Sequence, residues 1–203
     1  MIVLGITGNI GMGKSTVARM FEDLGAVRID TDAFVGELLG RPDVIQEVCE
    51  LFGDHVLRDG VLCRRRIAHM VFSNPRLRIG LENILHPRVF EMVDAQVEDL
   101  EKMAAPLIVA VEASVLFERS YQNRFDSVLT VHTTEETAFR RLEAKGMTRG
   151  DAKKRMESQF PIAMKVEKAD MTIDNGGTPD ETREQVRRIY ELLMLMEKQH
   201  GCN

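Results

Sequence analysis

The chain contains little cysteine and no long apolar segment. Its three cysteines, Cys49, Cys63 and Cys202, are odd in number and have no metal-ligand spacing. This favours reduced thiols in the cytoplasm over a disulfide framework or a zinc site. No run of about 18 apolar residues occurs, and no basic leader precedes an apolar core and a cleavage site. We therefore expect a cytoplasmic protein with no membrane partner.

The chain also lacks an excess of positive charge, internal repeats and low-complexity segments. Its net charge of −5 argues against general affinity for nucleic acid, so no nucleic-acid partner is expected. With 203 residues and 44% hydrophobic content, it can bury the core of one α/β domain and still carry an inserted piece. The oligomeric state does not follow from the sequence.

The stretch "GNIGMGKST" at residues 8–16 has the spacing G-x-x-x-x-G-K-[ST]. In this pattern the glycines let backbone N–H groups curl around phosphate oxygens, and the lysine adds a mobile positive charge. The serine hydroxyl is offered to the Mg²⁺ that accompanies ATP or GTP, at the start of a helix whose dipole favours an anion. The predicted nucleotide site consists of Gly8, Asn9, Ile10, Gly11, Met12, Gly13, Lys14, Ser15 and Thr16, with Ser15 as the metal ligand.

The segments on both sides of this loop agree with a strand, loop and helix order. Residues 2–7 are β-rich, and one helix face is marked afterwards by Val17, Met20, Phe21 and Leu24. A chance glycine-rich turn would match in roughly one chain in a hundred of this length. A dinucleotide-binding fingerprint fails, because it would require glycine where Thr16 stands.

Short β-rich segments alternate with helical patterns along the chain, at residues 2–7, 26–30, 106–114, 126–133 and 170–174. Helices between successive strands imply parallel pairing. The interval 32–105 has helical spacing instead, with a turn at Asp59-Gly60 and breaks at Pro75 and Pro87. We expect an α/β P-loop fold of three layers with a parallel central sheet. It forms a single domain with a core (1–31, 106–136, 169–203), a helical substrate-binding block (32–105) and a helical lid (about 137–168).

Two carboxylates, Asp30 and Asp32, flank the end of the second predicted strand. If the chain remains extended there, the two side chains share a face. Such a carboxylate can accept the proton of a substrate hydroxyl and orient its oxygen toward the γ-phosphorus of a nucleotide. The alternative is that Asp30 or Thr31 caps the next helix. Both roles can hold at once.

Positive charge is concentrated in residues 137–168, which contain nine basic and four acidic side chains. This segment has a net charge of +5, so the rest of the chain has a net charge of −10. A charge run alone is usually a solvated helix face. Beside a P-loop it favours a segment that closes over the transferring phosphate, since phosphoryl-transfer enzymes place cations there.

Several segments taken together resemble the dephospho-CoA kinase family. They are "GITGNIGMGKST", "IDTD", "LCRRRIAHMVFSNP", "LENILHP", "LFE" and "ADMTIDNGG", in that order. The resemblance spans roughly residues 2–177. It implies a nucleoside-monophosphate-kinase-like fold with a lid, and ATP- and Mg²⁺-dependent phosphorylation of the ribose 3′-hydroxyl of dephospho-CoA, the final step of coenzyme A synthesis.

The resemblance also implies roles for individual residues. Asp32 matches the acid assigned to the 3′-hydroxyl, with Asp30 beside it and Thr7 ahead of the loop. Arg64 and His86 match positions in the block that holds the CoA-like substrate, although His86 can equally be a structural helix-entry residue before Pro87. Residues expected to act on the nucleotide are Arg141 at the start of the lid, Lys145 within it and Asn175 at the adenine.

The sequence departs from the family pattern at three positions. A second lid arginine is replaced by Lys145, so this lysine serves as a point charge or neighbouring arginines share its work. A proline before the "LFE" stretch is replaced by Ser114, and Glu112 stands where aspartate is often found.

Two alternatives remain at this stage. Another P-loop small-molecule kinase, for a nucleoside or a sugar, would share the loop and the lid but not this set of motifs. A nucleotide-switch ATPase would not need the Asp30 and Asp32 pair, and no N-K-x-D motif of a GTPase occurs.

Overall fold

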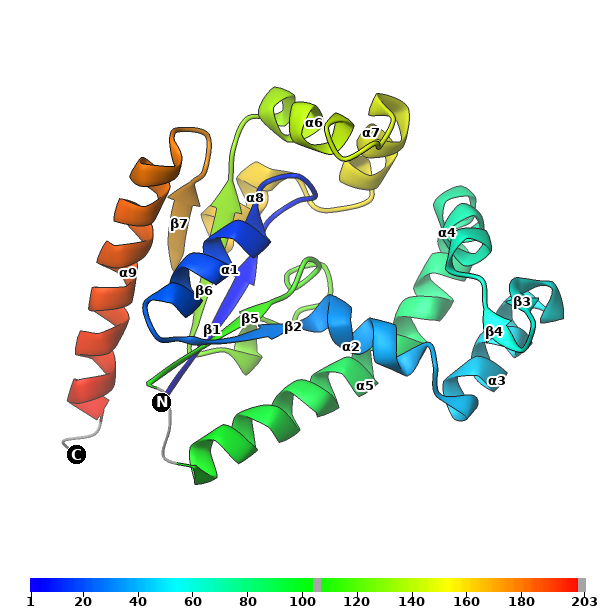
Figure 1. The fold of residues 1–203 in the computed structure, drawn as a ribbon, viewed down its shortest axis with the longest axis horizontal. Helices are drawn as coiled ribbons and strands as arrows, with labels where there is room; N and C mark the ends of the chain where they lie inside the picture. The colour runs from blue at the N-terminus through cyan, green and yellow to red at the C-terminus, as the bar shows by residue number, and fades with distance from the viewer. Residues whose placement is uncertain (104–106, 201–203) are drawn as a thin grey trace. The chain divides into compact units, whose positions relative to one another are not determined.

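The computed structural model describes residues 1–103 and 107–200 (Figure 1). Within this part, the chain divides into two compact units, one made of residues 1–30 with 97 onward and one made of residues 31–96. Cys202 and the first residue of the strand predicted at 106–114 lie outside the described residues. None of the described helices combines the length and the apolarity needed to cross a membrane.

A parallel sheet forms the centre of the first unit, with the strand order β2-β5-β1-β6-β7. All four pairings in it are parallel, as the alternation of patterns predicts. The strands match the predicted positions to within two residues: β1 (Ile2–Thr7), β2 (Val27–Asp30), β5 (Ile108–Glu112), β6 (Ser127–His132) and β7 (Met171–Asp174). The central strand β1 therefore leads straight into the predicted phosphate loop.

Two helices pack against this sheet and against each other, α1 (Lys14–Asp23) and α9 (Pro179–His200). Figure 1 shows α9 running beside β7. The apolar stripe predicted for α1 is confirmed for Val17 and Phe21, which are fully buried with Leu4 and Ile6 of β1, and Met20 is partly buried against the same core. The prediction is wrong for Leu24, which is exposed and follows the end of α1. Burying a side chain such as Val17 or Phe21 contributes roughly 1.5–3 kcal/mol. This core fixes the start of α1, and with it the end of the phosphate loop.

The segment after β6 forms three short helices of the same unit, α6 (Glu135–Glu143), α7 (Arg149–Glu157) and α8 (Ile162–Lys168). The N-caps of α6 and α7 are Thr134 and Thr148, whose hydroxyls accept hydrogen bonds from the N–H groups of Thr137 and Asp151. A short 3₁₀ helix, η2 (Gln122–Arg124), precedes β6.

The second unit is mostly helical and has its own core. Its elements are α2 (Thr31–Leu38), α3 (Pro42–Phe52), η1 (Asp54–Val56), β3 (Leu57–Arg58), β4 (Val61–Leu62), α4 (Arg64–Ser73) and the first part of α5 (Pro75–Lys102). Val44 and Val48 are buried in this core, as the spacing in α3 predicts. The predicted turn at Asp59-Gly60 is confirmed and joins β3 to β4, and the predicted break at Pro75 separates α4 from α5.

The break predicted at Pro87 is wrong, because Pro87 lies inside α5. Proline removes one backbone N–H and normally ends or kinks a helix. Here the helix has buried residues before and after the proline, Leu85 and Val89, so packing holds both sides of it in the core. Within the same turn, the guanidinium of Arg88 donates to the carbonyl of Ile84 at 2.7 Å.

Candidate active site

The loop between β1 and α1 has a backbone that only glycine adopts readily. Gly8 has φ +146° and Gly13 has φ +95°, both in the region that side chains disfavour. A Cβ on Gly8 would lie 2.3 Å from the carbonyl oxygen of Val131 in β6. Gly13 is the N-cap of α1 and makes no side-chain cap hydrogen bond, so the positive end of the helix dipole faces the loop.

Asn175 closes the loop from the side of β7. A Cβ on Gly13 would lie 2.0 Å from Asn175 Nδ2, which donates to the carbonyl oxygen of Met12 at 2.9 Å. The hydroxyl of Thr182 donates to Asn175 Oδ1 at 3.1 Å, and Arg141 Nη2 donates to the Asn175 carbonyl at 2.7 Å. The structure thus places Asn175 and Arg141 at the loop, with the Asn175 side chain buried and hydrogen-bonded on both sides.

The charged and hydroxyl groups of the motif lie at the start of α1. Lys14 Nζ donates to the carbonyl oxygens of Gly8 and Asn9, at 3.0 and 3.3 Å, and so lies back over the loop. Ser15 and Thr16 are exposed in the first turn of the helix. Because the helix dipole adds positive potential at the same place, this end of α1 suits a phosphate group.

The loop also has an apolar anchor in Met12. Its side chain is fully buried against Ala138, Phe139 and Leu142 of α6, and its Sδ accepts a hydrogen bond from the Thr133 N–H at 3.2 Å. The loop and the start of the predicted lid therefore share one small core.

Three buried polar atoms of residues in or around the loop have no hydrogen-bond partner within the described part of the chain. They are Asn9 Oδ1, Thr133 Oγ1 and Arg141 Nη1. Buried polar groups are nearly always satisfied in native proteins, so such atoms call for a ligand or water. The Arg141 guanidinium lies 3.5 Å from the position of a Cβ on Gly13. Arg141 Nη1 can donate to an anionic group, Thr133 Oγ1 can donate or accept, and Asn9 Oδ1 can only accept, so the set fits a ligand with both phosphate oxygens and hydrogen-bond donors, such as a hydrated nucleotide.

A charge cluster lies at the carboxyl ends of β2 and β5. Arg28 Nε donates to Glu112 Oε1 at 2.5 Å, and Arg28 Nη2 donates to Asp30 Oδ2 at 3.2 Å. Burial alone would lower the pKa of Arg28, but the hydrogen bond and charge of Glu112, with the charge of Asp30, raise it above the ordinary value. The sequence reasoning missed Arg28, although strand alternation places it on the same face as Asp30.

The shared face predicted for Asp30 and Asp32 required an extended chain between them, and the structure does not have one. Asp30 is the last residue of β2 and α2 begins at Thr31, so the chain does not stay extended between the two acids. Asp32 instead lies in the first turn of α2, where the helix dipole favours a carboxylate. It belongs to the second unit, whereas Asp30 ends a segment of the first.

The second unit also contains the other two residues predicted to bind substrate. Arg64 opens α4, is exposed, and donates from Nη2 to the carbonyl of Gly36 in α2 at 2.9 Å. His86 lies in α5 rather than before a helix start, and burial lowers its pKa, so the imidazole is neutral at pH 7. Thr7, in the first unit, is buried at the end of β1.

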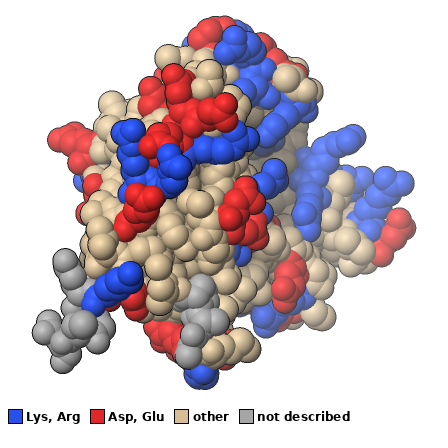
Figure 2. Space-filling model, turned by 60° about the vertical axis from the view of Figure 1, so that its left-hand side comes forward, with Lys and Arg blue, Asp and Glu red and all other residues tan. Residues whose placement is uncertain are grey.

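The predicted lid cations differ in their surroundings. Arg141 is half-buried at the loop, whereas Lys145 is exposed just beyond the end of α6. Arg149 is exposed and pairs with Glu136 at 2.5 Å, and its guanidinium lies 4.9 Å from the centre of the Phe139 ring. Figure 2 shows Lys and Arg side chains interspersed with Asp and Glu at the top of the view, the height of α6 and α7 in Figure 1.

No cluster of three His, Cys, Asp or Glu side chains suited to a metal occurs among the residues that the structure describes. Mg²⁺ is usually held by substrate phosphates, waters and only one or two protein groups. The exposed hydroxyl of Ser15 at the start of α1 is a fitting ligand of this kind.

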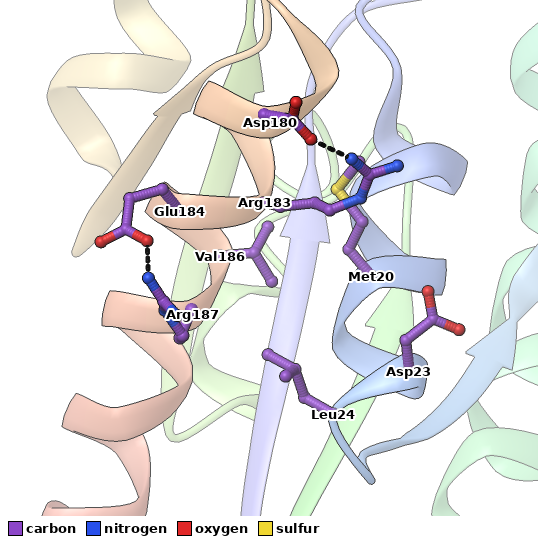
Figure 3. Close-up of a pocket in the computed structure, with 8 residues that line it drawn as sticks. All are labelled: Met20, Asp23, Leu24, Asp180, Arg183, Glu184, Val186 and Arg187. Carbon is purple, nitrogen blue, oxygen red and sulfur yellow. Dashed lines mark hydrogen bonds and ion pairs between the residues drawn. The ribbon is translucent and has the colours of Figure 1, made fainter.

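A different hollow, of about 320 Å³, lies between α1 and α9 (Figure 3). Met20, Leu24 and Val186 form its apolar part, and its arginines are neutralised within it. Arg183 pairs with Asp180 at 2.5 Å, and Arg187 pairs with Glu184. It contains no residue of the predicted site, and its paired arginines offer no free positive charge to a phosphate.

Comparison with known proteins agrees with this geometry. A family model described as dephospho-CoA kinase matches residues 2–181. A dephospho-CoA kinase of Aquifex aeolicus is 35% identical over 94% of this chain and 96% of its own length. One of Syntrophotalea carbinolica is 37% identical over 96% of this chain and 93% of its own.

Solved structures give the same result. Dephospho-CoA kinase from Campylobacter jejuni superposes with a TM-score of 0.67 at 25% identity, covering 93% of this chain and 95% of that one. A shikimate kinase from Acinetobacter baumannii shares the fold, with a TM-score of 0.56 at 16% identity. The match covers 96% of this chain and 93% of the shikimate kinase chain. The chain belongs to the dephospho-CoA kinase family.

Proposed function

We propose that this chain phosphorylates the ribose 3′-hydroxyl of dephospho-CoA with MgATP, using the loop of residues 8–16 to hold the triphosphate. The observation that carries the proposal is the glycine cradle after β1, where Asn175 and the β6 backbone occupy the space that any Cβ would need. The family catalyses the final step of coenzyme A biosynthesis and, as a kinase family, uses ATP.

On the nucleotide side, the backbone N–H groups at the start of α1 and the Lys14 ammonium hold the outer phosphates. Ser15 holds Mg²⁺, which when bound neutralises part of the triphosphate charge. Arg141 supplies a planar guanidinium from α6, supported by its hydrogen bond to Asn175. Lys145 adds a point charge from the segment after α6, and Asn175 forms the edge of the adenine site.

On the acceptor side, Asp32 accepts the proton of the 3′-hydroxyl as that oxygen bonds to the γ-phosphorus. The bond from that phosphorus to the bridging oxygen of ADP breaks in the same reaction. Asp30, held by Arg28, orients the acceptor, and Thr7 supports the start of the loop. Arg64 and His86 bind the CoA-like part, with His86 as a neutral hydrogen-bonding group.

The experiment is an acceptor panel with the purified chain and MgATP. Dephospho-CoA is expected to be phosphorylated with a kcat/KM at least about a hundredfold above that for adenosine or shikimate, because a built acceptor site rejects ligands that leave its polar groups unpaired. The 3′-deoxy analogue of dephospho-CoA should give no product. Equal rates with adenosine would instead support a general nucleoside kinase and would overturn the proposal.

A further inference from the structure

Lys165 in α8 is a buried charge that the proposed mechanism does not use. Its side chain is fully buried, and its Nζ lies 2.7 Å from Glu118 Oε1 and donates to the carbonyl of Ser114 at 2.8 Å. Burial lowers the pKa of Lys165, and the hydrogen bond and charge of Glu118 oppose this shift. A charge so far from water persists only with partners of this kind.

The carboxylate of this pair also holds the segment that joins α7 to α8. Glu118 Oε1 accepts a hydrogen bond from the Phe160 N–H at 2.9 Å. The ring of Phe160 packs with Leu116, Phe117 and Val128, so side chain and backbone fix the same residue. Residues 159–160, named here the strap, are therefore attached to the core of the first unit.

The strap in turn contacts the phosphate loop at two consecutive residues. The Phe160 carbonyl accepts from Asn9 Nδ2 at 3.1 Å, and Gln159 Oε1 accepts from the Ile10 N–H at 2.9 Å. The strap thus occupies the backbone donor of Ile10 and one side of Asn9.

A second connection runs to the residue before the loop. The Ser114 carbonyl that accepts from Lys165 also accepts from the hydroxyl of Thr7, at 3.4 Å. In addition, the hydroxyl of Thr130 in β6 donates to the Lys165 backbone carbonyl at 3.0 Å. The ion pair is therefore tied to the loop both before Gly8 and after it.

We propose that Lys165 and Glu118 are positioning residues for the phosphate loop, acting through the strap to fix the backbone of Asn9 and Ile10. The inference rests on the proposed role of this loop in holding the nucleotide. A cradle made of backbone N–H groups works only when those groups are held in place, since misplacement by about 1 Å can cost a hundredfold in rate. The pair acts on the loop through Phe160 and through the Ser114 carbonyl.

The test measures MgADP binding by calorimetry, together with the melting temperature and the KM values for both substrates. Gln159→Ala removes the acceptor for the Ile10 N–H and leaves the ion pair intact. It is expected to weaken MgADP binding at least about tenfold and to raise the KM for ATP, with little change in melting temperature or in the KM for dephospho-CoA. Gln46→Ala, which removes an exposed glutamine hydrogen bond in α3, is the matched control and should bind MgADP as the parent does.

A second set of variants tests the ion pair. Glu118→Ala removes both the charge and the acceptor of the Phe160 N–H, and should weaken MgADP binding as Gln159→Ala does. The double variant Lys165→Met with Glu118→Gln leaves no unpaired charge and keeps an acceptor for Phe160, so it should recover most of the binding.

Unchanged MgADP affinity in both Gln159→Ala and Glu118→Ala would overturn the inference, as would a loss that only follows the melting temperature. MgADP binding does not require dephospho-CoA or any other substrate that accepts the phosphoryl group. The test therefore distinguishes failure of this inference from failure of the substrate assignment. Normal MgADP binding by a parent that does not phosphorylate dephospho-CoA would count against the proposed function alone.

Discussion

Two acids near the end of β2 differ in their places in the fold, and we expect their substitutions to have different effects on turnover. Asp30 accepts a hydrogen bond from Arg28, whereas Asp32 lies in the first turn of α2. Asp32→Asn keeps the size and removes the basic oxygen, so turnover should fall by roughly a hundredfold or more, with ATP affinity little changed. Asp30→Asn should be milder, because asparagine still accepts a hydrogen bond. Steady-state kinetics with a melting curve for each variant provides the measurement.

Asp43→Asn is the matched control, since Asp43 also lies in the first turn of a helix, α3, and pairs with Arg41. It should be as active as the parent. The assignment of the 3′-hydroxyl to Asp32 fails if Asp32→Asn keeps full turnover, or if its loss merely follows a lower melting temperature.

Lys14 and Ser15 have separate roles in the loop and should give separate defects. Lys14→Ala removes a positive charge from the transferring phosphoryl group, so turnover should drop at least about a hundredfold. Ser15→Ala should chiefly raise the Mg²⁺ concentration needed for half-maximal rate. Lys102→Ala, which removes an exposed lysine paired with Asp99, controls for loss of charge. Near-normal turnover of a folded Lys14→Ala protein would show that this loop does not hold the reacting nucleotide.

The position of the phosphate loop could be predicted from the sequence, but the residues that pack against the loop and hold its backbone could not. The spacing of Gly8, Gly13 and Lys14 is local, so a motif reveals it. The contact of Asn175 with Gly13 joins residues far apart in the chain, and only the pairing of β7 with β6 brings them together. The links from Gln159 to Ile10 and from Glu118 to Phe160 were missed for the same reason.

At the scale of elements, α6 and α7 lie within the predicted lid, about residues 137–168, which we expect to respond to ligands. If residues 140–157 close over ATP and substrate, proteolysis there should slow when both ligands are present, because closure orders the segment. The cleavage rate is followed by mass spectrometry, and cleavage at Lys102, which is exposed at the end of α5 in the first unit, serves as an internal reference. Equal rates with and without saturating ligands would favour a solvated helix face.

The same elements predict an order of severity for two arginines. Arg141→Ala removes a half-buried guanidinium that contacts Asn175, so it should lower kcat/KM for ATP by at least about tenfold. Arg149→Ala removes an exposed pair with Glu136; because exposed pairs contribute little, its effect should be small. The reverse order would identify Arg149, not Arg141, as the arginine over the phosphates.

Element positions in the first unit follow from patterns that are complete within each segment. The inner strands β1, β5 and β6 are short, rich in apolar residues and almost entirely buried, and Val17 and Phe21 mark the buried face of α1, so these elements can be predicted from the sequence. Pro87 misled because proline is a local signal, while the packing of Leu85 and Val89 that overrides it is a tertiary one. The sequence also left open whether the chain stays extended between Asp30 and Asp32, and the structure answers this, since β2 passes into α2 at Thr31.

At the scale of the whole molecule, the division into two units predicts where nucleotide binding protects the backbone. MgADP at a hundred times its dissociation constant should stabilise the state that binds it by about 2.7 kcal/mol. Hydrogen exchange should therefore slow most in residues 8–24, with a smaller change in α3 of the second unit. Strongest protection in α3 would place the nucleotide away from the loop.

The parallel sheet has a further consequence for how the chain is made. Ile2 of β1 pairs with Ile108 of β5, and the other neighbour of β1 is β6. At 5–20 residues per second on the ribosome, β1 is synthesised roughly 5–20 s before either neighbour exists. The second unit is a continuous stretch, residues 31–96, and its partners emerge together. During translation, the helical unit can therefore fold before β1 and its phosphate loop have a neighbouring strand. Until then β1 is an unpaired apolar segment, which chaperones can recognise.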